Sequence, residues 1–373
     1  MLNNEMISIF IPVYKESDFL EPLLRGLLED PYREKEIFVV IDEPTERSIR
    51  ISEVFSSDNV HFIFNGERKG KANVLNEIVK DSKGTIFLFL DSDILIDGGK
   101  ESFLEIISRE MRDAEMIEVK KGVVKDSFIA RIVSYDYLSF NLTNWYFSSR
   151  MGRCLGVNGA AFAIRREVFE RLGGFRRVIC EDLDLATRSF VAGVRFKFVD
   201  KVSVYTKVPS RWREWFNQRR RWGIGAAFWF REHFKLLKRI VCKHPGIILP
   251  SLLFIFPALP LFLVSLFIPD DLSLKALYVS LILLSAKASI LLPPMALTST
   301  ALSMLRSFLI VVGNLTIYSL IFYVVAKKFH FNFNPFEFAI FYFIVAPIWL
   351  LIVIVSLFKV YIRPENIRVD WKV

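Results

Sequence analysis

Hydrophobic residues follow two different patterns along the chain. In the first part, short β-branched or aromatic runs alternate with segments in which apolar residues recur at helical spacing. This alternation predicts an α/β domain with a mostly parallel sheet. The expected strands cover Ile7–Val13, Glu36–Ile41, His61–Phe64 and Ile86–Leu90, and the expected helices lie near Phe19–Glu29, Thr45–Phe55 and Lys71–Lys80.

The last third of the chain is almost uniformly apolar. Only eight of the 49 basic and 40 acidic residues lie between Gly246 and Phe358, and a membrane-spanning helix needs about 20 apolar residues. The pattern predicts an all-α domain with four transmembrane helices, at about 246–268, 276–292, 307–326 and 338–358. A buried helical core is the alternative interpretation.

These patterns divide the chain into four expected parts. Residues 1–210 form a cytosolic α/β domain, 211–245 form interfacial helices, 246–362 form the transmembrane domain and 363–373 form a cytosolic tail. Basic residues precede the first expected span and follow the last one, so both termini are expected in the cytosol. The resulting location is the cell membrane, with a multi-pass topology.

Composition excludes several classes of protein. The hydrophobic share of 53% exceeds the ~45–50% of soluble domains, which argues against a purely soluble protein. Three cysteines without C-x-x-C spacing and four scattered histidines exclude a disulfide scaffold and a structural zinc site. The first apolar run, Ile7–Val13, is short and reads as a buried strand rather than a signal peptide.

Acidic residues follow the expected strands where each strand leaves the sheet. Asp91 and Asp93 come directly after the run Ile86–Leu90, and hard divalent cations prefer such oxygen ligands. A polar strand end without any metal is the alternative. Glu181 and Asp182 open an expected helix, where a carboxylate either complements the helix dipole or acts as a general base.

Two basic segments have more than one interpretation. The segment Arg68–Asn73 starts an expected helix and suits a phosphorylated ligand, although a solvated basic turn explains it equally well. The segment Arg211–Trp222 mixes guanidinium groups with indole rings, as in a juxtamembrane belt or a nucleic-acid site. Its position next to the apolar third argues against nucleic acid. Asp126–Arg150 is expected to be an interfacial helix or a core helix.

Several short motifs, in this order, resemble those of the inverting family 2 glycosyltransferases that carry a GT-A domain and membrane helices. Ile11–Glu16 resembles the opening strand motif, with Lys15 where Asn is common, and Asp42-Glu43 resembles the acidic pair that contacts the nucleoside. Gly70–Asn76 is similar to the G-K-A-x-x-L-N stretch, and Asp91-Ser92-Asp93 is similar to the D-x-D motif.

The resemblance continues toward the membrane part. Gly156–Gly159 resembles an acceptor-side loop, and Glu181-Asp182 resembles the end of the T-E-D motif, with Cys180 in place of Thr. Gln218–Trp222 fits Q-x-x-R-W, which is similar to the motif of cellulose, chitin and hyaluronan synthases and of ceramide glucosyltransferases.

The resemblance implies a role for each matching residue. Asp182 would be the catalytic base, and Asp93 with Asp91 would hold Mg²⁺ or Mn²⁺. The remaining residues would form two groups. Those expected to bind the donor nucleotide are Pro12, Tyr14, Glu16, Asp42, Lys71 and Asp91, and those expected near the acceptor and diphosphate are Gly159, Glu181, Gln218, Arg221 and Trp222.

The implied activity is transfer of a sugar from a UDP- or GDP-linked donor to a hydroxyl acceptor at the cytosolic membrane face. The acceptor would be a growing polysaccharide or a membrane lipid, and the bilayer would be a further partner. Two alternatives remain open at this stage. One is a polyprenyl-phosphate sugar synthase, and the other is a non-catalytic membrane scaffold that binds nucleotide sugars.

Overall fold

The computed structural model describes residues 5–97, 101–257, 259–260, 263, 270–288 and 298–362. The chain forms two compact units. One comprises residues 1–251 together with 351–373, and the other comprises residues 252–350. The expected tail at 363–373 lies outside the described residues.

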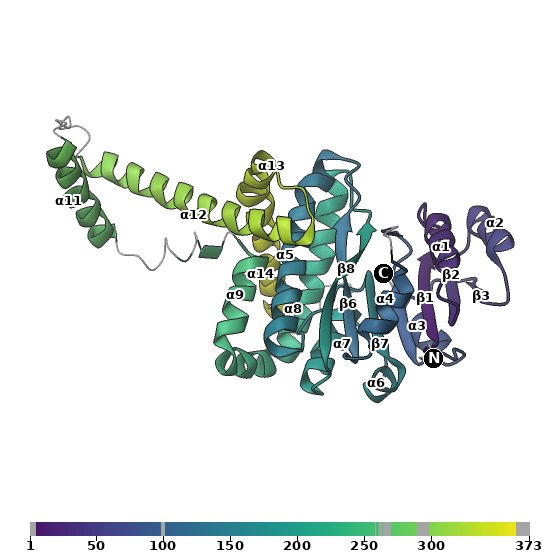
Figure 1. Ribbon diagram of the computed structural model, residues 1–373. Helices are drawn as coiled ribbons and strands as arrows, with labels where there is room; N and C mark the ends of the chain where they lie inside the picture. The colour runs from purple at the N-terminus through teal and green to yellow at the C-terminus, as the bar shows by residue number, and fades with distance from the viewer. Residues whose placement is uncertain are drawn as a thin grey trace. The chain divides into compact units, whose positions relative to one another are not determined.

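The first unit is built on an eight-stranded sheet with the order β3-β2-β1-β4-β7-β6-β8-β5 (Figure 1). Pairing among β1, β2, β3 and β4 is parallel, whereas β7 is antiparallel to both β4 and β6. The pairing of β6 with β8 is also parallel, and that of β5 with β8 is antiparallel, so the sheet is mixed and most of its pairing is parallel, as expected. Its strands are β1 (Ile7–Tyr14), β2 (Lys35–Asp42), β3 (Val60–Asn65), β4 (Ile86–Leu90), β5 (Ile94–Ile96), β6 (Met116–Val123), β7 (Ala161–Arg165) and β8 (Phe196–Thr206).

Helices alternate with the strands in the first part of the chain, as the hydrophobic pattern predicted. All four expected strands and all three expected helices are present, within one or two residues at most ends. The helices of this unit are α1 (Leu20–Glu29), α2 (Glu46–Phe55), α3 (Lys71–Ile78), α4 (Phe103–Glu110), α5 (Phe128–Met151), α6 (Arg166–Arg171), α7 (Glu181–Val191) and α8 (Trp212–Lys243).

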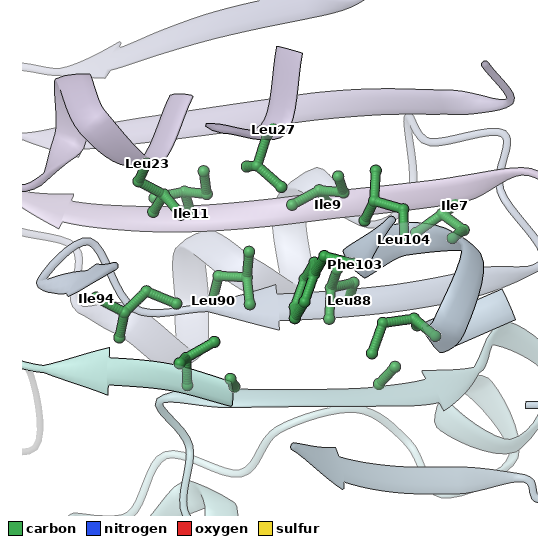
Figure 2. Close-up of a cluster of buried hydrophobic side chains, with 14 of the residues drawn as sticks. Ile7, Ile9, Ile11, Leu23, Leu27, Leu88, Leu90, Ile94, Phe103 and Leu104 are labelled. Atoms are coloured by element: carbon green, nitrogen blue, oxygen red, sulfur yellow. The ribbon is translucent and has the colours of Figure 1, made fainter. Parts of the chain in front are cut away.

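The period-two alternation of β1 and β4 forms two hydrophobic layers, one on each face of the sheet. Figure 2 shows one layer, in which Ile9 of β1 and Leu88 of β4 lie with Leu27 of α1 and Leu104 of α4. The opposite face is aromatic: Phe10 of β1 lies 5.3 Å, centroid to centroid, from the ring of Phe89. The rings of Phe169 of α6 and of Phe175 contact Phe89 on this aromatic face, so helices lie on both faces of the sheet.

The strand order reverses between β1 and β4. The chain runs from β1 outward to β2 and β3, and then returns to place β4 on the other side of β1. In open sheets, ligands bind in the crevice beyond the carboxyl ends of strands at such a reversal. Tyr14, Asp42 and Asp91 stand at or directly after the ends of β1, β2 and β4.

Helix α5 belongs to the core of the first unit. Ile132, Val133 and Leu138 are almost completely buried, and the helix packs against β6 and β8. Of the two interpretations of Asp126–Arg150, the structure therefore supports core packing, and the interfacial one is wrong.

The apolar third has two candidate membrane spans among the described residues, not four. The third and fourth expected spans fall on α12 (Ser299–Phe329) and on the helical segment Pro335–Ile362, both long and apolar enough to cross a bilayer. This segment contains α13 (Pro335–Ile340), the π-helical turn η2 (Phe341–Val345) and α14 (Ala346–Ile362).

The first two expected spans do not meet the same criteria. Helix α9 (Pro245–Ile255) has 11 residues, about half the length that a bilayer needs. Helix α11 (Asp270–Ala288) carries Asp270, Asp271, Lys275 and Lys287, and charges within a span are costly. The remaining residues of these two expected spans lie in part outside the described ones.

Candidate active site

Lys71 brings together two acidic segments that are far apart in the sequence. It is the first residue of α3, after Gly70, whose φ of 86° turns the chain into the helix. Lys71 Nζ donates a hydrogen bond to Asp91 Oδ1 at 2.5 Å and lies 3.5 Å from Glu181 Oε1. The end of β4 and the start of α7 therefore meet at the start of α3.

Asp182, the next residue on α7, is oriented by backbone amides. Gly159 N–H donates to Oδ2 and Leu183 N–H donates to Oδ1, both at 2.7 Å. A Cβ atom on Gly159 would lie 3.0 Å from Asp182 Oδ2 and 3.3 Å from Lys71 Nζ. Glycine at position 159 is what allows the carboxylate to approach this loop.

The cluster of Lys71 with Asp91, Asp93, Glu181 and Asp182 contains more carboxyl groups than cations, and several of its pKa values are shifted. Burial raises the pKa of Asp182, and it raises the pKa of Glu181 to about 7. Desolvation by the surrounding protein and the charge of Asp91 raise the pKa of Asp93 to about 7, although its surface is open to water. The pKa of Lys71 is raised because Asp91 and Glu181 outweigh the effect of burial. Negative charge exceeds positive charge here.

The donor set at the end of β4 fits a divalent metal ion. Asp91 and Asp93 offer hard carboxylate oxygens two residues apart. Desolvation and then the nearby charge of Asp91 raise the pKa of the Asp93 carboxyl, and the charge of Lys71 offsets only part of this. A bound cation would relieve this repulsion.

A second acidic group lies where α7 and α8 approach each other. Ligand atoms of Asp184, Glu232 and His233 all lie within 4.8 Å of one another. However, Arg176 contacts both Asp184 and Glu232, and Arg188 contacts the other Asp184 oxygen at 2.8 Å. Guanidinium groups already neutralise these carboxylates, so the arrangement is an ion-pair network and fits a metal ion poorly.

Asp42, expected to contact the nucleoside, accepts hydrogen bonds from other parts of the protein instead. Asn65 Nδ2 donates to its Oδ1, and the amides of Lys69 and Gly70 donate to its Oδ2, each at 2.9 Å. The residue is only 5% exposed. Asp42 therefore holds the turn that precedes α3 and thereby positions Lys71.

The other expected nucleoside contacts surround an open face. Tyr14 is 45% exposed, its ring lies 4.3 Å from the Arg68 guanidinium carbon, and its hydroxyl donates to Glu43. Glu16 accepts a hydrogen bond from the Thr45 hydroxyl at 2.6 Å. The neighbouring Lys15 has a left-handed φ of 63°.

Pro12, also expected to contact the donor, lies in β1 beside Val40 of β2.

Helix α8 carries the Q-x-x-R-W segment, with Gln218, Arg221 and Trp222. Within this segment the buried residue is Arg219. Arg219 Nη2 lies 2.8 Å from Asp136 Oδ2 of α5 in a fully buried ion pair. Its guanidinium carbon lies 4.6 Å from the centroid of the Trp222 ring. The sequence motif gave Arg219 no role, because only its partner 83 positions earlier explains it.

Two further links were missed at the level of sequence. Asn76 at the end of the G-K-A-x-x-L-N stretch exchanges two hydrogen bonds with the backbone of Phe175, at 2.8 and 2.9 Å. Buried Glu118 of β6 pairs with Lys121 at 2.6 Å and also accepts the amide of Asn158. The asparagine in the motif was the available signal for the first link, whereas nothing in the sequence marked the second.

The family described as Glycosyl transferase family 2 matches residues 8–173. This segment, less than half of the chain, is similar to glycosyl transferase family 2 domains. The match begins in β1 and ends after α6, so it includes Lys71, Asp91, Asp93 and Gly159. It does not reach Asp182 or helix α8.

Curated relatives extend further along the chain. The probable glycosyltransferase YdaM of Bacillus subtilis is 25% identical over 295 residues, which cover 74% of this chain and 70% of YdaM. The poly-beta-1,6-N-acetyl-D-glucosamine synthase of Staphylococcus aureus strain MSSA476 is 22% identical over 238 residues, 63% of this chain. The match spans 58% of the synthase, less than two thirds of its length.

A solved structure supports the fold of the domain. The mannosyltransferase PcManGT from Pyrobaculum calidifontis, determined in complex with GDP-Man and Mn²⁺, aligns with a TM-score of 0.50 and 20% identity. The alignment covers 84% of this chain and 88% of that one. The mixed α/β sheet is thus the GT-A-like sheet that the motifs predicted.

Proposed function

We propose that this chain is a membrane-associated, inverting, metal-dependent glycosyltransferase that uses a nucleotide-diphosphate sugar. The observation that carries the proposal is the meeting of Asp91, Lys71, Glu181 and Asp182 at the edge of the sheet where the strand order reverses. A cation beside several carboxylates suits a diphosphate, a metal ion and a proton acceptor in one site.

Asp182 is the base in this proposal. The amides of Gly159 and Leu183 each occupy one lone pair of its carboxylate, and a carboxylate has about four such positions. Its raised pKa makes it a better proton acceptor than a solvated aspartate. An acceptor hydroxyl that loses its proton to Asp182 attacks the anomeric carbon opposite the diphosphate, which inverts the configuration.

Asp93 and Asp91 would hold Mg²⁺ or Mn²⁺, which stabilises negative charge on the leaving diphosphate. The Mn²⁺ bound to the structurally similar mannosyltransferase supports this choice. Lys71 lies at the N-terminus of α3, where the helix dipole also favours an anion. Lys71 thus binds the same diphosphate from the protein side. Gln218, Arg221 and Trp222 close the acceptor side.

We propose a growing polysaccharide as the acceptor, because the staphylococcal relatives are named for a polymer of N-acetylglucosamine. A membrane lipid is the second candidate. It is favoured by the presence of only two candidate spans among the described residues, since a channel for polymer export needs more wall.

The domain is proposed to face the cytosol, because basic residues of α8 precede the apolar third. Cys242 near the end of α8 is an exposed natural probe. A membrane-impermeant maleimide should label it only after sealed cells are opened. Labelling in intact cells would place the domain outside.

The decisive experiment incubates membranes that contain the chain with labelled UDP- and GDP-sugars and Mn²⁺. Lipid and polymer fractions are then extracted separately, and released nucleoside diphosphate is measured. Label in the polymer fraction supports polysaccharide synthesis, and label in the lipid fraction supports the second candidate. Absence of both label and nucleoside diphosphate with every donor would favour the non-catalytic scaffold. Asp182→Asn membranes are the matched control.

A further inference from the structure

Helix α8 carries two glycines, Gly223 and Gly225, directly after the Q-x-x-R-W segment. Glycine is unfavourable inside a helix, by about 1 kcal/mol relative to alanine. Neither glycine has a left-handed φ, so the backbone does not need glycine for its conformation. The missing side chain is therefore what these positions use.

The two glycines lie on opposite faces of the helix. Each residue of an α-helix turns the chain by about 100°, so positions two apart point in nearly opposite directions. Helix α8 can thus contact one neighbour on the side of Gly223 and a different neighbour on the side of Gly225.

Gly225 faces the segment that leads into α7, the helix that carries the proposed base Asp182. A Cβ atom at this position would overlap Cys180 Sγ and would lie 2.9 Å from Ile179 Cγ2, closer than real Cβ atoms come to other atoms. Cys180 is the N-cap residue of α7 and directly precedes Glu181 and Asp182. The backbone of α8 thus touches the residue that begins the helix of the proposed base.

Gly223 faces α14, whose residues from Leu351 on belong to the same compact unit as α8. A Cβ atom there would lie 2.8 Å from Ser356 Oγ and 3.1 Å from Ile352 Cγ2. Two turns further along, Arg231 Nη1 donates to the carbonyl oxygen of Val360 at 3.0 Å. Helix α8 is therefore held against a candidate membrane span on the face opposite Cys180.

A polar contact also ties α8 to α7. Trp229 Nε1 donates to Thr187 Oγ1 at 2.9 Å, one turn after Gly225. Gly225 and Trp229 are four residues apart and share one helix face. This face meets the N-terminus of α7 at Cys180 and its middle at Thr187.

We propose that Gly225 is a positioning residue for glycosyl transfer. Its close contact with Cys180 sets where Asp182 lies relative to Arg221 and Trp222, while Gly223 holds the same helix against α14. This inference rests on the proposed function of Asp182. It also gives the departure from threonine a reason, because the thiol of Cys180 fills the space that Gly225 leaves.

The test is Gly225→Ala, alone and with Cys180→Ala. A displacement of about 1 Å can cost roughly 10²-fold in rate, so kcat should fall about 10²-fold in Gly225→Ala while the donor KM changes less than about threefold. Removing the thiol in the double variant should recover part of the loss, because the overlap with Cys180 is the closer one and the contact with Ile179 at 2.9 Å remains. A merely structural role would lower the melting temperature without this recovery of kcat.

Gly26→Ala is the matched control, because Gly26 lies in α1 and nothing is within 4 Å of a Cβ there. It should keep wild-type kcat and raise the melting temperature slightly, as alanine favours a helix. If Gly225→Ala does not fold, Cys180→Val enlarges the same contact from the other side and should lower kcat in the same way.

Two results would overturn the inference: wild-type kcat in Gly225→Ala, or a loss of kcat that Cys180→Ala does not recover. If the wild-type chain transfers no sugar, the proposed function fails, and the contact is then measured by melting temperatures alone. Changes at positions 225 and 180 should be non-additive if the two residues touch. Strictly additive changes would disprove the contact itself.

Discussion

Two groups of carboxylates lie at the same edge of the sheet, and the protein treats them differently. Asp42 accepts three hydrogen bonds from its own chain and is almost fully buried. Around Lys71, by contrast, Asp91, Glu181 and Asp182 share one contacting cation or lie beside it. Saturation by the fold marks a structural carboxylate, and an excess of negative charge marks a place for a proton, a metal ion or a cationic group.

The largest expected effect is a loss of turnover on substitution of Asp182, which belongs to the group around Lys71. Asp182→Asn should lower turnover by roughly 10²–10⁴-fold, because an amide cannot accept the proton. One backbone amide loses its acceptor, so the free energy of unfolding should fall by only about 1 kcal/mol. Acceptor-dependent turnover and urea unfolding on the same preparation measure both. Near-normal turnover would show that Asp182 is not the base, and Glu181 would be tested next.

The next effect concerns the metal ion. Excess chelator should abolish transfer, and Mn²⁺ should restore it, because the charge of Asp91 raises the pKa of Asp93 and a bound cation would offset that repulsion. Asp93→Ala should lower turnover by about 10²-fold or more and weaken donor binding as well. Titration of the donor with and without Mn²⁺ checks the link. Full activity in chelator would show that Lys71 and other protein cations suffice.

A smaller effect on turnover, with a larger one on stability, is expected at Asp42. Asp42→Ala leaves two amides and the Asn65 side chain without their acceptor, and such buried donors cost about 1–3 kcal/mol each. The free energy of unfolding should therefore fall by about 3 kcal/mol or more. The comparison fails if this variant is as stable as the wild type and loses only donor affinity.

The smallest effect is expected at the exposed face of Tyr14. Tyr14→Ala removes a ring on which a nucleobase can stack, an interaction of about 1–3 kcal/mol. The donor KM should rise roughly tenfold, while kcat stays within about threefold. Tyr14→Phe, which keeps the ring, is the matched variant, and its donor KM should be much closer to that of the wild type. Equal KM values in all three proteins would exclude stacking.

Much of the fold could be predicted because its signals are local. The runs that became β1 to β4 and the helical patterns between them were readable one segment at a time. The family resemblance also implied that Lys71, Asp91 and Asp182 belong to one site. The structure brings them together, and their chemical roles stay predictions.

The features that escaped prediction depend on partners distant in sequence or on the backbone. The role of Arg219 depends on its ion pair with Asp136, which is far away in the sequence. Asp42 accepts hydrogen bonds from backbone amides, which no sequence motif marks. The count of membrane spans was wrong for another reason. Among the described residues, α9 is shorter than the apolar run that predicted a span, and α11 begins before the expected span and so includes Lys275 as well as Lys287.

Lys15 stands in the left-handed region at the end of β1, a conformation that costs a lysine about 1–2 kcal/mol and an asparagine less. The sequences that this chain resembles commonly have asparagine there. The lysine ammonium lies 3.7 Å from the Glu43 carboxylate, beside the exposed ring of Tyr14. Directed evolution for heat resistance would therefore be expected to replace this lysine early.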